Sequence, residues 1–128
     1  MEVKYDFTGK VILIVEDIDT SSHFYRAALR NTNAELIVVE DGQSAINVFD
    51  SPKHIDLVFL DLNLPDFDGF EVLKYIRKSN KDIPVVVQTA YVLSGEEETS
   101  YKLGANGFIT KPVTVDILQK TIADSMLP

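Results

Sequence analysis

Five short apolar runs, separated by segments with helical periodicity, constrain the fold more than any other feature of this sequence. The first run, KVILIV, follows the turn residue Gly9 and is apolar at consecutive rather than alternate positions. That pattern is typical of a parallel strand covered by helices on both faces. The runs span Lys10–Val15, Ala34–Val39, Leu57–Leu60, Ile83–Thr89 and Gly107–Thr110. We expect each of them to form a strand.

Helical patterns fill the segments between these runs and follow the last one. Apolar residues at helical spacing predict helices over Thr20–Arg30, Gln43–Phe49, Phe70–Lys78 and Thr114–Ser125. Another helix is predicted by Ser94 and Glu97, which have the spacing of a capping box, and it ends at Gly104. In the last helix, Val115, Leu118 and Ile122 form the expected apolar stripe. The alternation predicts an α/β fold, a doubly wound five-stranded parallel sheet with helices on both faces.

Length and composition fit one such domain. The chain has 128 residues and is 45% hydrophobic, so we expect one folded domain at 9–128, preceded by a short N-terminal tether at 1–8. A formal net charge of −8 disfavours nucleic-acid binding. The absence of cysteine excludes disulfides and thiolate metal sites. The sequence shows neither a signal peptide nor an apolar run of about 18 residues, so we expect a cytoplasmic domain without membrane contact.

Polar residues stand at the ends of four of the five predicted strands. In a doubly wound sheet, ligands bind outside the carboxyl ends of the strands. Glu16 and Asp17 follow the first strand, Asp61 ends the third, Thr89 ends the fourth and Lys111 follows the fifth. We therefore expect three carboxylates, one hydroxyl and one ammonium group to meet at one edge of the sheet.

Three neighbouring carboxylates repel one another, and a cation is needed to hold them together. Hard oxygen ligands suit Mg²⁺, or Mn²⁺ in its place. A carboxylate beside such an ion can act as a nucleophile toward phosphorus, so we expect Asp61 to be phosphorylated. Lys111 and Thr89 would then bind the phosphoryl oxygens. Each residue taken singly has an ordinary structural explanation, such as a turn, a helix cap or a solvated lysine. The prediction rests on their convergence.

The motifs that carry these residues resemble those of response regulator receiver domains. They are ILIVEDIDT, LVFLDLNLPDFDGFEVL, VVVQTAY and GANGFITKPV, and the resemblance extends from about Gly9 to Leu127. It implies a flavodoxin-like (βα)5 fold with Asp61 as phosphoacceptor. It also implies that Asp17 binds the metal directly, Glu16 binds it through water, and Asn63 offers its backbone carbonyl. Thr89 and Phe108 would form the conformational switch.

The same resemblance predicts a cis peptide between Lys111 and Pro112 and a phosphorelay function. The sequence is most similar to receivers of hybrid sensor histidine kinases, and it would be a stand-alone receiver or part of such a protein. The donor would be a phosphohistidine on a histidine kinase or a histidine phosphotransfer domain, docking over Ile18 and the first helix. His23 and His54 are expected to be ordinary surface histidines. Tyr91 would shield the phosphorylated aspartate from water.

The face from Ser94 to Ser125 is where such domains often dimerise or bind targets. We expect the domain to catalyse its own phosphorylation and dephosphorylation and not to turn over an external substrate.

Two alternatives have different chemistry. One is a docking module that works without phosphorylation. The other is an Asp-nucleophile phosphatase, which Asn63 disfavours because those enzymes carry a second aspartate there. A flavodoxin-like cofactor binder is disfavoured because EDIDT, after the first strand, would repel a phosphate.

Overall fold

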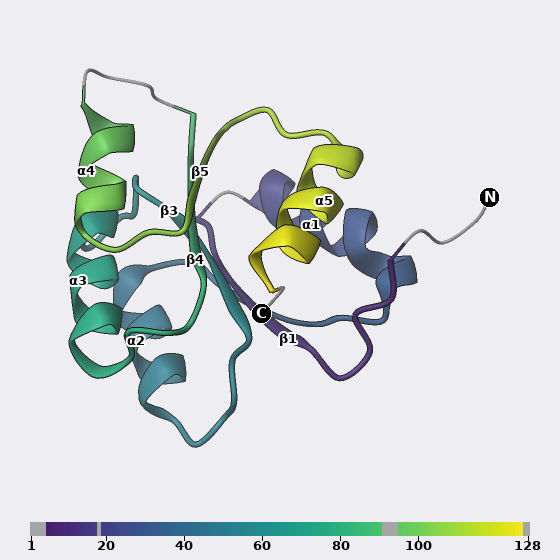
Figure 1. Ribbon diagram of the computed structural model, residues 1–128, viewed down its shortest axis with the longest axis horizontal. Helices are drawn as coiled ribbons and strands as arrows, with labels where there is room; N and C mark the ends of the chain where they lie inside the picture. Colours follow the sequence, from purple (N-terminus) through teal and green to yellow (C-terminus); the bar gives the residue numbers. More distant parts are fainter. Residues whose placement is uncertain (1–4, 18, 91–94, 127–128) are drawn as a thin grey trace.

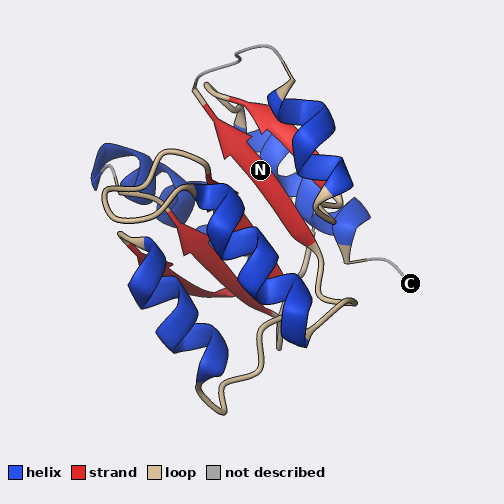
Figure 2. Cartoon of the chain, turned by 90° about the vertical axis from the view of Figure 1, so that its left-hand side faces the viewer, coloured by secondary structure: helices blue, strands red, loops and turns tan. Residues whose placement is uncertain are grey.

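The computed structural model describes residues 5–17, 19–90 and 95–126, and it contains one five-stranded parallel sheet (Figures 1 and 2). The strand order is β2-β1-β3-β4-β5. The elements are β1 (Val11–Val15), α1 (Asp19–Leu29), the 3-10 helix η1 (Arg30–Thr32), β2 (Glu35–Val39), α2 (Gly42–Asp50), β3 (Leu57–Asp61), α3 (Gly69–Ser79), β4 (Val85–Thr89), α4 (Glu96–Lys102), β5 (Gly107–Thr110) and α5 (Val115–Ser125). The expected strand–helix alternation and the doubly wound parallel sheet are confirmed.

Two details differ from the sequence prediction. Helix α4 begins at Glu96 after Gly95, which has φ +92 and supplies no side-chain cap, so the predicted capping box does not form the helix start. Ser94, its proposed first member, lies outside the described residues. In α5, Leu118 and Ile122 are buried, but Val115 is 41% exposed, so it does not belong to the packed stripe. Val115 is the first residue of the helix, directly after the N-cap residue Thr114.

Helices cover the sheet on both faces, α1 and α5 on one and α2, α3 and α4 on the other (Figure 1). Alternate residues of each inner strand serve the two faces, as the pleat requires. On β1, Leu13 packs in the core beneath α2 and α3, whereas Ile12 and Ile14 pack in the core beneath α1 and α5. All residues of β1, β3 and β4 are buried. This explains why those strands are apolar at consecutive positions.

The described part of the predicted N-terminal tether, residues 5–8, packs against the domain. Phe7 is buried, its ring stacks on that of Tyr5, and its backbone N–H donates to the carbonyl of Thr32. None of the helices in the described ranges is long and apolar enough to cross a membrane.

Candidate functional site

The site lies where β1, β3, β4 and β5 end, at the carboxyl edge of the sheet. The register places Val15 beside Leu60 and Asp61 beside Gln88, so the strands reach this edge at the same level. Glu16 continues the ladder beyond β1, since its backbone N–H donates to the carbonyl of Val39. The side chains predicted for this edge are therefore brought together by strand register, without a long loop.

Lys111 bridges two of the carboxylates. Its Nζ atom donates to Oδ2 of Asp61 at 2.9 Å and also contacts Oε2 of Glu16. The Lys111 backbone N–H donates to the carbonyl of Thr89, 2.9 Å away, and this bond fixes the chain just after β5 against the end of β4. The Lys111–Pro112 peptide is cis, as predicted. The ammonium group thus lies inside the cluster and is not a solvated surface charge.

The cluster is buried to an unusual degree for ionisable groups. Glu16 is 1% exposed, Asp61 3% and Thr89 1%. Burial raises the pKa of Glu16 to about 7, with Lys111 acting to lower it and the neighbouring Asp61 acting to raise it. Within the described residues, Oε1 of Glu16 also lacks a hydrogen-bond partner. Glu16 is therefore held in an unfavourable environment as long as no further cation joins the cluster.

This predicts a pH-dependent stability of the metal-free domain. The pKa of Glu16 rises from 4.5 to about 7 on folding, so the folded state binds this proton more tightly than the unfolded state does. The stability gained from this proton is therefore complete below pH 4.5 and is lost as the pH rises through 7. Thermal unfolding in a chelator should show the wild type losing about 3 kcal/mol relative to Glu16→Gln over that window. Glu98 is an exposed glutamate on α4, and Glu98→Gln is the control. Its stability should depend on pH as that of the wild type does. A pH dependence equal in Glu16→Gln and wild type would contradict the prediction.

The donor set fits a hard divalent cation. Oxygen atoms of Glu16, Asp17 and Asp61 all lie within 4.8 Å of one another, and Asp17 is the exposed member of the three. Asn63 lies just after β3, and its backbone N–H donates to Oδ1 of Asp61 at 2.9 Å. Oxygen ligands without sulfur or imidazole suit Mg²⁺. The unpartnered Oε1 atom of Glu16 adds an acceptor that such an ion would satisfy, directly or through water.

The turn that follows Asp61 is held tightly at both ends. The backbone N–H of Gly69, at the start of α3, donates to the carbonyl of Leu62 at 3.0 Å. A Cβ atom on Gly69 would lie 2.5 Å from the backbone oxygen of Asp61, so only glycine allows this approach. Farther along the turn, the Asp66 carboxylate accepts the backbone N–H groups of Gly42 and Gln43 at the start of α2, at 2.8 and 2.9 Å. The carboxylate of Asp61 is thus carried by a fixed turn.

Two buried polar residues beside the site were not predicted. Gln88 is 0% exposed and Tyr25 is 2% exposed, and the Tyr25 hydroxyl donates to Oε1 of Gln88. The sequence did contain a signal for Gln88, because an amide inside the otherwise apolar run VVVQT needs a buried partner.

Other predicted residues lie outside the cluster. Phe108 on β5 is partly buried and packs against the core beneath α2 and α3. His23 and His54 are exposed, as predicted, and His54 Nε2 lies 2.8 Å from Oδ1 of Asp56. Tyr91 and Ile18 lie outside the described residues, so the shielding and docking roles predicted for them stay predictions.

The sequence matches the profile of the response regulator receiver domain over residues 12–123. The sensor histidine kinase RcsC of Escherichia coli K12 is 31% identical over 117 residues, which cover 91% of this chain and 12% of that protein. The polar-differentiation response regulator DivK of Brucella ovis is 30% identical over 115 residues, which cover 88% of this chain and 93% of that protein. The chain therefore spans about an eighth of the kinase but nearly the whole of the small regulator.

Solved structures show the same fold. The receiver domain of the sensor histidine kinase PA1611 from Pseudomonas aeruginosa PAO1 has a TM-score of 0.84 and 27% identity, over 93% of this chain and 98% of that one. That crystal structure has a magnesium ion coordinated in its active site cleft. A CheY-like receiver domain protein from Methanospirillum hungatei has a TM-score of 0.86 at 24% identity, which bears on the fold alone.

Proposed function

The chain belongs to the response regulator receiver domain family of two-component signalling, and on that basis we propose that it accepts a phosphoryl group from a phosphohistidine donor onto Asp61. The observation that carries the proposal is the Lys111 ammonium group against the Asp61 carboxylate, inside a buried cluster of acids. A carboxylate held in this way is oriented and partly neutralised before any donor arrives. The switch in conformation that follows would control a partner or a linked domain.

The chemical step needs one new bond and one broken bond. An oxygen of Asp61 attacks phosphorus, the bond from phosphorus to the histidine nitrogen breaks, and its electron pair stays on the imidazole. Lys111 contacts Asp61 Oδ2 at the start and is placed to follow the charge onto the phosphoryl oxygens. Glu16, Asp17, Asp61 and the backbone carbonyl of Asn63 would hold Mg²⁺, which supplies positive charge against the phosphoryl oxygens.

Thr89 and Phe108 are proposed to convert this chemistry into a change of conformation. Thr89 ends β4, where a hydroxyl can donate to a phosphoryl oxygen, and Phe108 lies on the neighbouring strand beside Val87. A phosphoryl group shifts the population of two conformations only by its different contacts with each. Since Phe108 has no hydroxyl, its part in the switch is limited to packing.

The experiment that tests the function is the intact mass of the protein after incubation with acetyl phosphate, with and without Mg²⁺. A Mg²⁺-dependent gain of one phosphoryl group is expected. If the protein gains nothing while a control receiver reacts, and a histidine-phosphorylated partner also fails to transfer, the domain is a docking module. Slow loss of the group in the absence of any other substrate would fit a domain that catalyses its own dephosphorylation and is not an external phosphatase.

Lys111→Met is expected to slow phosphorylation by about tenfold or more, because the acceptor loses the cation that orients it. The rate with acetyl phosphate, followed by intact mass, measures this. Lys120→Met is the matched control, since Lys120 also pairs with an aspartate, Asp124, but on the exposed surface of α5. Equal rates in the two variants would show that the Lys111 bridge has no part in the reaction.

We further propose partners on two surfaces, in the cytoplasm. The donor would be a histidine kinase or a histidine phosphotransfer domain, approaching the acid cluster from the side of α1. The output partner, or a second copy of the chain, would bind the face from 94 to 125, where Tyr101 on α4 is 46% exposed. The net charge of −8 opposes nucleic acid as a direct ligand.

A further inference from the structure

A row of three polar residues crosses the sheet at the site, and only two of them belong to the acid cluster. Asp61 on β3 is paired in register with Gln88 on β4, and Glu16 follows Val15, whose partner on β3 is Leu60. The strands are about 4.8 Å apart, so the Gln88 side chain is the direct neighbour of the acceptor on the side away from Glu16. All three residues are buried.

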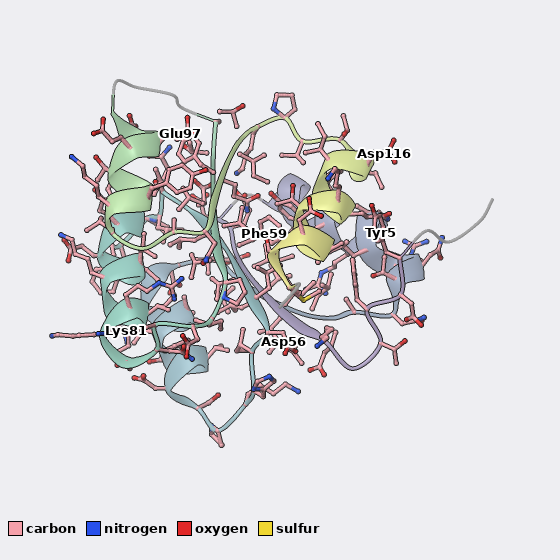
Figure 3. All side chains as sticks on the ribbon, in the orientation of Figure 1. Tyr5, Asp56, Phe59, Lys81, Glu97 and Asp116 are labelled. Atoms are coloured by element: carbon pink, nitrogen blue, oxygen red, sulfur yellow. The ribbon has the colours of Figure 1, made fainter. Side chains whose placement is uncertain are left out.

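Alternation along the strands places this row on the face of α1 and α5. Ile14, Phe59 and Val86 each precede one member of the row by two residues, and all three belong to the core beneath those helices. Figure 3 shows Phe59 in the middle of the fold, close to α5. The row is therefore the polar end of an otherwise apolar layer.

Tyr25 of α1 covers that layer and holds Gln88. Its ring stacks on Phe59 with 6.3 Å between centroids, and its hydroxyl donates to Oε1 of Gln88. Burial raises the pKa of Tyr25, as do the negative charges of Glu16 and Asp61, so the hydroxyl keeps its proton and remains a donor. With Oε1 occupied in this way, the amide orientation of Gln88 is fixed, and its Nε2 group is left as the donor.

Across the described residues, two buried side-chain polar atoms lack a hydrogen-bond partner, Nε2 of Gln88 and Oε1 of Glu16. Both lie in this row, one on each side of Asp61. An unpaired buried donor destabilises the fold, so an amide N–H group without a partner beside the proposed acceptor indicates a role other than packing. The Asp61 carboxylate can accept more bonds than those from Asn63 and Lys111.

We propose that Gln88, held by Tyr25, is a positioning residue that donates its amide N–H to Asp61 during phosphoryl transfer. This inference rests on the proposed function of Asp61. The amide acts on the acceptor from the strand next to it, whereas Lys111 reaches it from the loop after β5. Gln88 thereby restricts the rotation of the carboxylate and aims one oxygen at the incoming phosphorus. The step itself is unchanged, with the same bond formed and the same bond broken.

The test compares Gln88→Met, Tyr25→Phe and the double variant with the wild type, with acetyl phosphate and saturating Mg²⁺. We expect the maximal phosphorylation rate to fall about tenfold in Gln88→Met and less in Tyr25→Phe, with the half-saturating acetyl phosphate concentration unchanged. The double variant should be no slower than Gln88→Met, because Tyr25 acts through Gln88. Gln88→Met leaves the buried Tyr25 hydroxyl without its acceptor, and Tyr25→Phe leaves Oε1 of Gln88 without its donor, so each single variant should melt at a lower temperature than the double variant, which removes the whole hydrogen bond.

Gln119→Met is the matched control. Gln119 of α5 donates its amide to the carbonyl of Ala28 at 2.9 Å, so it also joins two elements on this face but lies away from the acceptor. A wild-type rate in both Gln88→Met and Tyr25→Phe overturns the inference and leaves the proposed function intact. If the wild type takes up no phosphoryl group from any donor, the proposed function is wrong, and the inference about Gln88 fails with it. If Gln88→Met fails to fold, Tyr25→Phe alone decides between these results.

Discussion

Asp61→Asn should take up no phosphoryl group under conditions in which the wild type takes up one. The amide keeps the size of the side chain but removes the nucleophilic oxygen anion, and it also removes one of the two carboxylates bonded to Lys111. Intact mass after incubation with acetyl phosphate and Mg²⁺ gives the result directly. We expect the largest functional effect of any single substitution here, a complete loss rather than a slower rate.

The control for this prediction is Asp124→Asn. Asp124 is also an aspartate bonded to a lysine, Lys120, but the pair is exposed on α5. The Asp124→Asn variant should be phosphorylated to the same extent as the wild type. A phosphoryl group retained by Asp61→Asn would place the acceptor elsewhere, and peptide mapping would then locate it. Because the substitution also removes a buried negative charge, Asp61→Asn should be at least as stable as the wild type without metal, which separates lost chemistry from lost folding.

Gly69→Ala is expected to cause the largest loss of stability, about 3 kcal/mol. The added Cβ atom would meet the backbone oxygen of Asp61 at 2.5 Å and the Cα atom of Leu62 at 2.6 Å. Neither atom is the end of a flexible side chain, so the turn itself has to move. Chemical denaturation of the metal-free protein measures the loss. Since the displaced residue is the proposed acceptor, we expect the phosphorylation rate at low temperature to fall as well.

Gly107→Ala provides the comparison for that experiment. A Cβ atom on Gly107 would lie 3.5 Å from the nearest atom of Val86, an ordinary contact, although Gly107 is also at the end of an element. Its stability should change by less than about 1 kcal/mol. If the two alanine variants were equally stable, the close approach of α3 to the end of β3 would not be a feature of the protein in solution.

The sequence predicted the sheet because its strands are buried on both faces. The runs that form Val11–Val15 and Val85–Thr89 are β-branched and of strand length, so they favoured strands, and the residues that follow them were expected to meet at one edge. Glu16, Asp61 and Lys111 were found in this way, since order along the chain decides which side chains reach that edge. The roles of Thr89 and Phe108 in switching remain predictions.

What the sequence could not show depends on contacts between distant segments. In the sequence, Asp66 is indistinguishable from an ordinary loop aspartate. In the fold its carboxylate accepts the backbone N–H groups of Gly42 and Gln43 at the start of α2, and no local pattern predicts these bonds. The partner of Gln88 could not be chosen among the hydroxyls and amides of the chain without α1 in place. Helix ends were misplaced where a cap was inferred from spacing alone, as at Gly95.

The lysine inside the acid cluster also sets which ions the site can balance. Three carboxylates and one ammonium group leave a formal charge of −3 + 1 = −2. A single divalent cation cancels that charge, whereas a monovalent ion leaves an excess and a trivalent ion reverses it. Charge balance at this site therefore favours a divalent ion over a monovalent or a trivalent one. A site neutralised in this way would no longer repel an approaching phosphoryl group, so the proposed ion would also admit an anionic donor.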